Sequence, residues 1–240
     1  MRWKDKGIIN KTKFSMYYSG SSNRSGLYGT GFIISKNLKN FVIGFKPVSD
    51  RICCIRLRGK FCLFNNLTFI SAYAPTEDAD DDVKDDFYDS LGKTLNEVSS
   101  HDSVIVLGDF NAKIGKEEYV RNIAGKFSLH ETTSPNGHRL CQFAEETCLK
   151  IKSTSFERKN IHKGTWKIPG SSVSNQIDHV LISARWASSV MSVRSCRGER
   201  MKMIQRNTRS SQESYKSKRI AATKLCRKKK KKIIVLSNQD

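Results

Sequence analysis

The sequence predicts an α/β layered domain over residues 1–200 and a basic tail over residues 201–240. Short runs of β-forming residues alternate with two amphipathic patterns of helical period, which favours sheets covered by helices. A chain of 240 residues is long enough to bury a core, and one domain of roughly 200 residues is a common size. Hydrophobic residues make up only 38% of the chain, and the shortfall lies mainly in the tail.

Strands are expected first, at residues 29–34, 41–45, 51–58 and 67–73. The first is entered through closely spaced glycines, which permit a tight backbone. The third has the period-two alternation of a half-buried strand. The fourth is rich in β-forming residues and stops at Pro75, because proline cannot donate to a sheet ladder.

A helix is expected after this strand, with Thr76 as its N-cap. Acidic residues in its first turn are favoured by the helix dipole. Apolar residues then recur every three or four positions and form one face: Val83, Phe87, Leu91, Leu95 and Val98. The acidic run over residues 77–86 is also compatible with a metal site, but helix-start chemistry and solvation explain it.

The second half of the domain continues the alternation. Residues 103–107 form a continuous apolar run that ends in Gly108, which is typical of a fully buried central strand. Two further strand-like runs cover residues 151–156 and 175–183. A second helix, before these two runs, is expected to start near Asn136 and to bury Leu140, Phe143, Ala144 and Cys148.

The charge of the chain favours a polyanionic partner. The net charge is +20, and the tail carries thirteen Lys and Arg against Glu213 and Asp240. Basic side chains that neutralise phosphates release counterions, which drives binding to nucleic acid. The six consecutive basic residues at 227–232 are typical of disordered nuclear-localisation or nucleic-acid-binding segments. A solvated surface and coil without a partner is the alternative.

Cysteine usage and hydropathy indicate the cellular compartment in which the protein is expected. The seven cysteines show no repeated spacing and no CxxC pair, and no signal peptide is evident, so neither a disulfide framework nor a zinc site is expected. Reduced thiols fit the nucleus or the cytosol rather than a secreted protein. No apolar run approaches the roughly 18 residues that a membrane span needs, so no membrane partner is expected. Nothing in the sequence indicates an oligomer.

The sharpest candidate for chemistry is the segment that follows the central strand. Asp109 and Asn111 are two residues apart, so on a strand both side chains would point to one side. The carboxylate could orient or deprotonate a water, while the amide could donate to a phosphate oxygen. A structural role is the alternative, because Asp and Asn also end strands by making turns.

Two more strand-like segments carry candidate residues. Asp178 stands among apolar β-forming residues, where a buried carboxylate needs a cation or an imidazole as partner. Shared metal ligation by Asp178 and His179 is not favoured, because neighbouring strand residues point to opposite faces. Tyr73 ends another strand and could donate its hydroxyl to an anion, although an isolated tyrosine is more often a packing residue.

Taken together, these segments resemble the endonuclease/exonuclease/phosphatase (DNase-I-like) superfamily, in particular its retrotransposon branch of craniofacial development protein 2-like sequences. The resemblance extends over residues 1–200. The matching segments are Arg2-Trp3-Lys4, Gly7-Ile8-Ile9, Tyr18-Ser19-Gly20, residues 29–32, Arg51-Ile52, residues 74–78, residues 108–115, Asn136-Gly137, Thr165-Trp166-Lys167 and residues 175–182.

The resemblance implies a fold, a reaction and site residues. The family fold is a four-layered α/β sandwich, with two mostly antiparallel sheets face to face and helices outside. Its reaction is Mg²⁺- or Mn²⁺-assisted phosphodiester hydrolysis of DNA. By position, Asp109 would prepare the attacking water and Asn111 would contact the phosphate. Tyr73 would occupy a phosphate-contacting position, where this branch often has His, and Asp178 would orient a catalytic histidine.

The sequence departs from the family pattern at both ends. The family places an Asn and a metal-binding Gln-Glu pair before the position of Arg2-Trp3, and a Ser-Asp-His strand after an Arg-Gly like Arg197-Gly198. Neither motif is found here, and we therefore expect a domain truncated at both ends. Residues acting as a unit lose most of their effect when one is missing, so weak or absent nuclease activity and marginal stability are expected.

Three functions remain open from the sequence. The first is a DNA endonuclease domain, and the second is a non-catalytic remnant that binds nucleic acid. The third is a phosphatase of the same fold, which is less favoured because the matching segments are those of retrotransposon endonucleases. The nucleus is the expected compartment.

Overall fold

The computed structural model describes residues 4–22, 28–59 and 66–196. The predictions for the tail over residues 201–240 lie outside these residues, as do Arg2, Trp3 and Gly198. Residues Met1–Ser195 form one compact unit.

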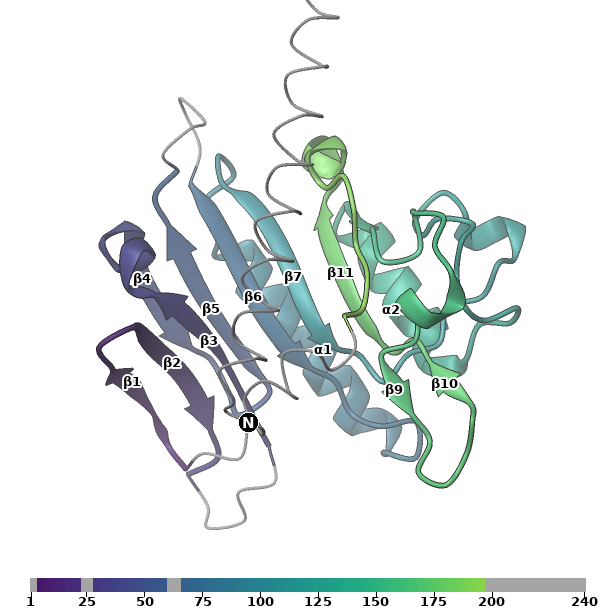
Figure 1. Ribbon diagram of the computed structural model, residues 1–240, viewed down its shortest axis with the longest axis horizontal. Coiled ribbons are helices and arrows are strands. Elements are labelled where there is room, and N and C mark those ends of the chain that lie inside the picture. The colour runs from purple at the N-terminus through teal and green to yellow at the C-terminus, as the bar shows by residue number, and fades with distance from the viewer. Residues whose placement is uncertain (1–3, 23–27, 60–65, 197–240) are drawn as a thin grey trace, which may run out of the picture. The chain divides into compact units, whose positions relative to one another are not determined.

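A six-stranded mixed sheet forms the centre of this unit (Figure 1). Its neighbours pair antiparallel, except that β6 and β7 are parallel. The parallel pair is joined through a helix, as a crossover connection requires. In spatial order the strands are β4 (Val42–Pro47), β5 (Ile52–Leu57), β6 (Leu67–Tyr73), β7 (Ser103–Asp109), β11 (Asp178–Ser183) and β8 (Leu149–Ile151).

A smaller antiparallel sheet packs on one face of the large sheet. It consists of β1 (Lys6–Asn10), β2 (Phe14–Gly20) and β3 (Gly29–Ser35), and β3 contacts β5 and β6. The sequence did not predict β1 and β2, because β1 is short and β2 mixes hydroxyl side chains with apolar ones. A separate two-stranded ribbon is formed by β9 (Trp166–Lys167) and β10 (Ser174–Asn175).

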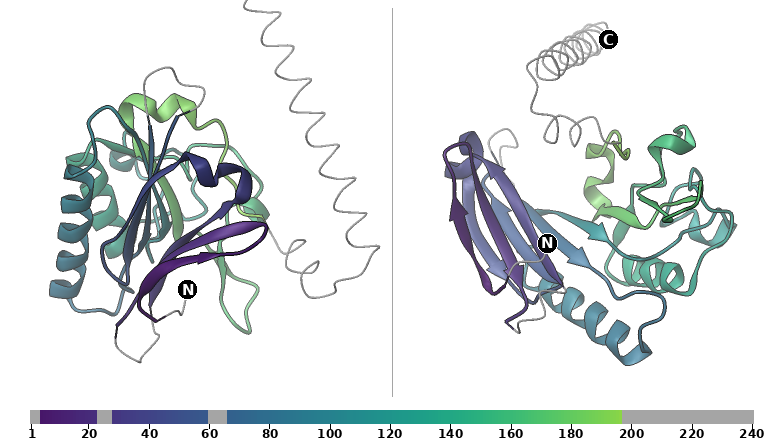
Figure 2. Two further views of the ribbon diagram at one scale, coloured as in Figure 1. Left: turned by 90° about the vertical axis from the view of Figure 1, so that its left-hand side faces the viewer. Right: turned by 60° about the horizontal axis from the view of Figure 1, so that its bottom comes forward.

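Two α-helices cover the other face of the large sheet (Figure 2). α1 spans Asp81–Asn96, starting four residues later than expected, with Asp80 rather than Thr76 at the N-cap. α2 spans Pro135–Glu146, and its N-cap Ser134 accepts a hydrogen bond from the backbone N–H of Gly137. Four short 3-10 helices complete the fold: Lys36–Phe41, Glu118–Val120, Asn160–His162 and Ala184–Ser189.

The α/β sandwich is thus confirmed as two sheets with helices. Within the described residues it has three layers, and no α-helix there covers the outer face of the smaller sheet.

The main core lies between the helices and the large sheet. Phe87 and Leu91 of α1 pack with Ile70 of β6 and Val106 of β7, and α2 adds Leu140, Phe143 and Ala144. The expected apolar face of α1 is only partly buried, since Val83 is 44% exposed.

The prediction that residues 103–107 are buried on both faces was wrong. β7 alternates between buried and half-buried residues, with Val104 and Val106 facing the helices. Ile105 and Leu107 face the other side, where β3 packs mainly against β5 and β6.

The last predicted strands are shorter than expected. Strand β8 ends at Ile151 rather than 156, and the run at 175–183 is divided between β10 and β11. Cys148, expected in the core, is exposed and has a left-handed backbone with φ of 53°, because it lies in the turn after α2. The cysteines at 53, 54, 141, 148 and 196 are all free. None of the helices among the described residues is long and apolar enough to cross a membrane.

Candidate active site at the strand ends

Three of the predicted site residues meet where neighbouring strands of the large sheet begin or end. Tyr73 is the last residue of β6 and pairs in register with Asp109, the last residue of β7. Asp178 is the first residue of β11 and stands directly opposite Asp109 in the antiparallel ladder. The topology therefore brings together three residues that are far apart in the sequence.

Gly108 allows the chain to reach this position. Its φ is +154°, and a Cβ atom built there would lie 1.8 Å from the backbone oxygen of Ala72 on the adjacent strand. Only glycine tolerates both the dihedral and the close approach. The residue just before Asp109 is therefore fixed by the geometry of the parallel pair.

Asp109 is a half-buried carboxylate with no cation beside it in the described part of the chain. It accepts a hydrogen bond from the backbone N–H of Asn111 at 3.0 Å. Burial is the main cause that raises the pKa of Asp109 to about 6; the Asn111 N–H lowers this pKa and the facing carboxylate of Asp178 adds to the rise, and both effects are included in that value. A carboxyl group with such a pKa can exchange a proton near neutral pH.

Asp178 differs from the sequence prediction. We expected a buried carboxylate with a cation or imidazole partner, whereas the side chain is exposed and the hydroxyl of Thr165 is its hydrogen-bond partner. The reason is that β11 starts at this residue, at the open end of the sheet. Protein atoms still displace part of the water around the carboxylate, and this desolvation raises the pKa of Asp178.

Asn111 also lies differently from the prediction. β7 ends at Asp109, and Asn111 follows in a left-handed conformation with φ of 47°, so the two side chains are not alternate positions of one strand. The Asn111 amide donates to the backbone oxygen of Ala74 at 2.9 Å. One of its two N–H groups thus ties the segment after β7 to the segment after β6, and an amide has a second N–H that can donate.

Asn136 fixes these two segments to α2. It is 3% exposed, and its amide donates to the backbone oxygens of Pro75 at 3.2 Å and Asn111 at 3.1 Å. Its backbone N–H donates to Glu77 at 3.0 Å. The sequence indicated Asn136 as a helix start and as one of the family-matching residues, but not this bridging role, because the two carbonyl groups come from segments distant in the chain.

His179 supports the same segment from inside the core. It is 1% exposed, its Nε2 lies 2.9 Å from the backbone oxygen of Ala112, and its Nδ1 lies 2.7 Å from the Ser153 hydroxyl. A carbonyl oxygen only accepts, so Nε2 carries the hydrogen and Nδ1 accepts from Ser153. Burial lowers the pKa of His179 to about 4. Both ring nitrogens are thus engaged with partners inside the protein.

A cavity of about 280 Å³ adjoins Asp178 of the carboxylate pair. Asp178 and Thr165 line it together with two cationic side chains, Lys163 and Arg194. Anionic ligands are therefore matched by positive charge on this side of Asp178.

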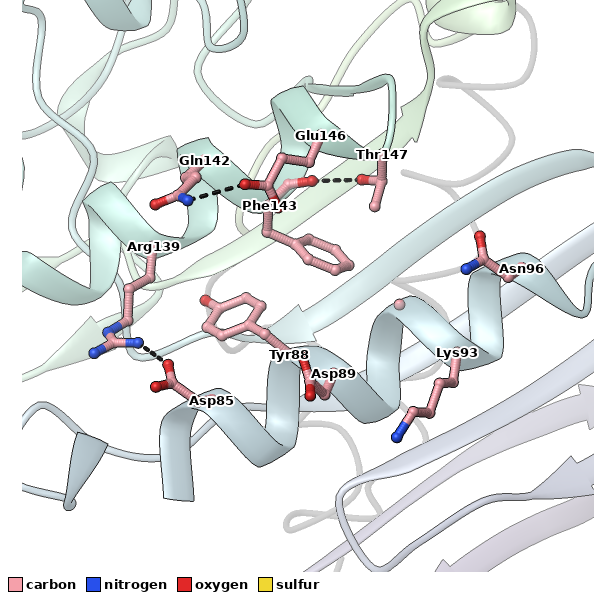
Figure 3. A pocket seen from close by; sticks show the side chains of 11 residues that line it. Asp85, Tyr88, Asp89, Lys93, Asn96, Arg139, Gln142, Phe143, Glu146 and Thr147 are labelled. Atoms are coloured by element: carbon pink, nitrogen blue, oxygen red, sulfur yellow. Dashed lines mark hydrogen bonds and ion pairs between the residues drawn. The ribbon is translucent and has the colours of Figure 1, made fainter. Parts of the chain in front are cut away.

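A larger cleft of about 470 Å³ lies between α1 and α2 (Figure 3). It is crossed by the ion pair of Arg139 with Asp85, and Tyr88 and Phe143 form its floor. It shares no residue with the strand ends, and we do not assign the chemistry to it.

The metal-binding capacity at the strand ends is incomplete. Within the described residues, no group of three or more His, Cys, Asp or Glu side chains is arranged to hold a metal ion. Asp109 and Asp178 are two carboxylates in facing positions. Mg²⁺ is commonly bound by one or two carboxylates together with substrate phosphates and waters, so the donors present fit this ion in part.

Comparison with known proteins agrees with this architecture. No family model matches the chain. The chain is 33% identical over 196 residues to craniofacial development protein 2 of Bos taurus, and 32% identical over 196 residues to that of Tragulus javanicus. Each alignment covers 81% of this chain but only 32% and 33% of those proteins, so the chain spans about a third of their length.

A solved structure shows the same fold. The catalytic domain of Xenopus laevis APE2 superposes with a TM-score of 0.52 at 16% identity, covering 75% of this chain and 69% of that domain. Over most of its length, this chain is similar in sequence to craniofacial development protein 2, and its fold matches that of endonuclease/exonuclease/phosphatase (DNase-I-like) proteins.

Proposed function

We propose that this domain has a phosphodiesterase site for DNA at the ends of β6, β7 and β11. The observation that supports it most is the facing pair of Asp109 and Asp178, in which burial raises the pKa of Asp109 to about 6. General bases operate best with a pKa near the working pH. The net charge of +20 supports a polyanionic substrate.

Asp109 would act as the base. Above a pH of about 6 it is mostly ionised and can accept a proton from a water that attacks phosphorus in line. The second N–H of Asn111 and the hydroxyl of Tyr73 are donors that can face a phosphate oxygen. Asn136 and His179 would act as positioning residues, because they hold the backbone around Asn111 and Ala112 without reaching the substrate.

A divalent cation, Mg²⁺ or Mn²⁺, would neutralise charge on the phosphate when bound. Asp178 is the side chain in the described residues that would hold it together with phosphate oxygens and waters, because a cation bound directly to Asp109 would lower the pKa that suits a base. A single carboxylate ligand predicts weak binding in the absence of substrate. We therefore propose that hydrolysis by this 240-residue polypeptide is weak.

The net charge of +20 also favours a second candidate, a domain that binds nucleic acid without hydrolysing it. In that case the carboxylates would remain as a relic of the fold, and the basic surface and tail would carry the function.

Incubation of the purified chain with supercoiled plasmid and Mg²⁺ tests the proposal. We expect slow nicking that is lost with EDTA and in Asp109→Ala, but retained in Asp86→Ala, which removes an exposed carboxylate on α1. Folding of each variant is checked by circular dichroism. A folded chain that never nicks, with either Mg²⁺ or Mn²⁺, would leave nucleic-acid binding as the function. Release of phosphate from small monoesters without nicking would instead indicate a phosphatase.

We also propose that the protein acts in the nucleus, on the basis of the basic residues at 227–232. A fluorescent fusion of the whole chain tests this by microscopy. Replacing the six basic residues with Gln should abolish nuclear accumulation, and unchanged accumulation would contradict the proposal.

A further inference from the structure

Arg51, immediately before β5, forms a cluster with two tyrosines. Its guanidinium lies 3.9 Å from the centroid of the Tyr28 ring and 5.3 Å from that of Tyr73. The two rings are 5.9 Å apart and tilted. Arg51 also donates from Nη1 to the backbone oxygen of Tyr73 at 3.1 Å. The side chain is therefore held in one place by stacking and by a hydrogen bond, which reduces the entropy lost when it binds a ligand.

The charge of Arg51 is not balanced. In the described part of the chain, no carboxylate forms an ion pair with it. A guanidinium has five N–H donors in a rigid fork, and the hydrogen bond to Tyr73 uses one of them. Arg51 is nevertheless half-buried, and partial burial of an unpaired charge is unfavourable unless a ligand or solvent compensates it.

Arg56, on β5, shows how an arginine charge is neutralised within this fold. Arg56 donates from Nε and Nη2 to the two carboxylate oxygens of Asp102 at 2.7 and 2.8 Å. Asp102 is buried and also accepts from Thr68. The Arg56 charge is thus neutralised within the fold by a bidentate pair, whereas that of Arg51 is preorganised and left available.

Arg51 lies on the same edge of the sheet as the carboxylate pair. Tyr73, which it contacts, pairs in register with Asp109, and β5 and β7 are separated by β6 alone. Two strand spacings are roughly 10 Å, which is more than the rise of about 3.4 Å for one nucleotide along a DNA strand. This separation leaves room for a phosphate at Arg51 that is a neighbour of the phosphate at Asp109.

We propose that Arg51, supported by Tyr28 and Tyr73, binds a flanking phosphate of a polynucleotide and so selects a nucleic acid strand over a small phosphomonoester. This inference rests on the proposed function, because it assigns the substrate class of that site. Lys163 and Arg194 line the cavity beside Asp178, so cations would flank the carboxylate pair from both β5 and the far side of β11.

Binding of a short fluorescent DNA duplex in EDTA tests the proposal, because no hydrolysis occurs under these conditions. Arg51→Gln keeps a donor for the Tyr73 oxygen but removes the charge. We expect its affinity to fall about tenfold, and the slope of log affinity against log salt to fall by about 0.9. Arg58→Gln is the matched control, since it removes an exposed arginine just beyond the opposite end of β5. That variant should lose less than about twofold.

The tyrosine platform gives a second, independent test. Tyr28→Leu removes the ring beneath the guanidinium and should weaken binding by about threefold to fivefold, while Tyr28→Phe keeps the ring and should bind normally. Unfolding midpoints and near-ultraviolet circular dichroism confirm that each variant is folded. Equal affinity and salt slope for Arg51→Gln and the native chain would overturn the proposal, and so would an equal loss in Arg58→Gln.

The two proposals fail separately. If plasmid nicking never occurs but the difference between Arg51→Gln and Arg58→Gln persists, the phosphate contact stands and the hydrolytic function does not. If nicking occurs and Arg51→Gln both binds and nicks like the native chain, the hydrolytic function stands and the phosphate contact does not.

Discussion

The middle of β7 and its end are only a few residues apart, yet they follow different physical rules. In the middle, every second side chain, including Val104 and Val106, points toward the helix-covered core. At the end, Gly108 has a φ of +154°, Asn111 has a φ of 47°, and Asp109 is a half-buried carboxylate without a cation among the described residues. Apolar burial stabilises the middle, whereas strain and unbalanced charge are concentrated at the end.

The difference teaches how the site is kept in place. Uncommon backbone conformations cost about 1–3 kcal/mol each and persist only where the surroundings determine them. Here Asn136 and His179 provide these surroundings, because they bind backbone oxygens of Asn111 and Ala112 from α2 and β11. The core thus stabilises a strand end that would not be stable alone, and the following variants test this division.

The largest effect is expected at the junction, in Gly108→Ala. The added Cβ would lie 1.8 Å from the Ala72 oxygen at a φ of +154°, so β6 and β7 would have to separate. We expect a loss of about 4 kcal/mol or more in the free energy of unfolding, measured by urea denaturation. Gly44→Ala is the control, because nothing lies within 4 Å of its Cβ position. Similar losses in both variants would contradict the proposed role of the close strand approach.

The next effect concerns the core that supports the middle of β7. Leu91→Ala creates a cavity beneath α1 at a side chain that is fully buried, and we expect a loss of about 3 kcal/mol. Val83→Ala on the same helix, where the side chain is 44% exposed, should change the free energy of unfolding by less than about 0.5 kcal/mol. If the two variants were equally destabilised, the assignment of the buried face of α1 would be wrong.

His179→Leu tests the support of the strand end from within the core. The substitution leaves the Ala112 oxygen and the Ser153 hydroxyl without their imidazole partner, and an unsatisfied buried polar group costs about 1–3 kcal/mol. We expect a loss of about 2 kcal/mol in chemical denaturation. His138→Leu replaces an exposed histidine on α2 and should be nearly neutral, so a neutral His179→Leu would refute the supporting role.

The smallest effect is a gain of stability in Asp109→Asn. Burial raises the pKa of Asp109 from 3.8 to about 6 in the folded state, so the folded state binds the proton more tightly than the unfolded state. The contribution of this group to stability is present below a pH of about 4 and is lost as the pH rises through about 6. Asp109→Asn should therefore raise the free energy of unfolding by about 1–2 kcal/mol at pH 7.5 and by almost nothing at pH 4.

The pKa of His179 is shifted in the opposite direction, which gives a second test of the same pH dependence. Its pKa is lowered from 6.5 to about 4, so the unfolded state binds the extra proton, and the stability that His179 contributes is lost as the pH falls from about 6.5 to 4. The two groups oppose each other over this range in the native chain. Removing the Asp109 charge should make the acid destabilisation steeper, and an unchanged pH profile would argue against the raised pKa of Asp109.

Local sequence patterns anticipated much of the architecture. The strand at 67–73 was predicted from its β-forming residues, and the strand predicted at 103–107 from its apolar run extends to Asp109 in the structure. The apolar periodicity of α2 predicted its buried Leu140, Phe143 and Ala144. The start of α1 was misplaced because several acidic residues in a row are suitable for a first turn. β1 and β2 were missed because β1 is short and β2 mixes hydroxyl side chains with apolar ones.

The candidate site could be predicted in its residues but not in its geometry. Asp109, Tyr73 and Asp178 are brought together as strand registers place them, and the roles assigned to them remain predictions. The sequence singled out Arg51 only as one of the residues that match the family. The sequence shows no difference between Arg51 and Arg56, since only the fold provides Asp102 for one and two tyrosines for the other.

By itself the sequence determined the α/β class, the basic tail, the order of the motifs and the identity of the carboxylates, because these depend on composition and on short-range periodicity. Tertiary structure alone decided which carboxylates face each other and why residue 108 is glycine. It also decided which arginine has an ion-pair partner among the described residues and which has none. These properties depend on contacts between strands that are distant in the chain, and burial and neighbouring charges at those contacts set the pKa values and the available donors.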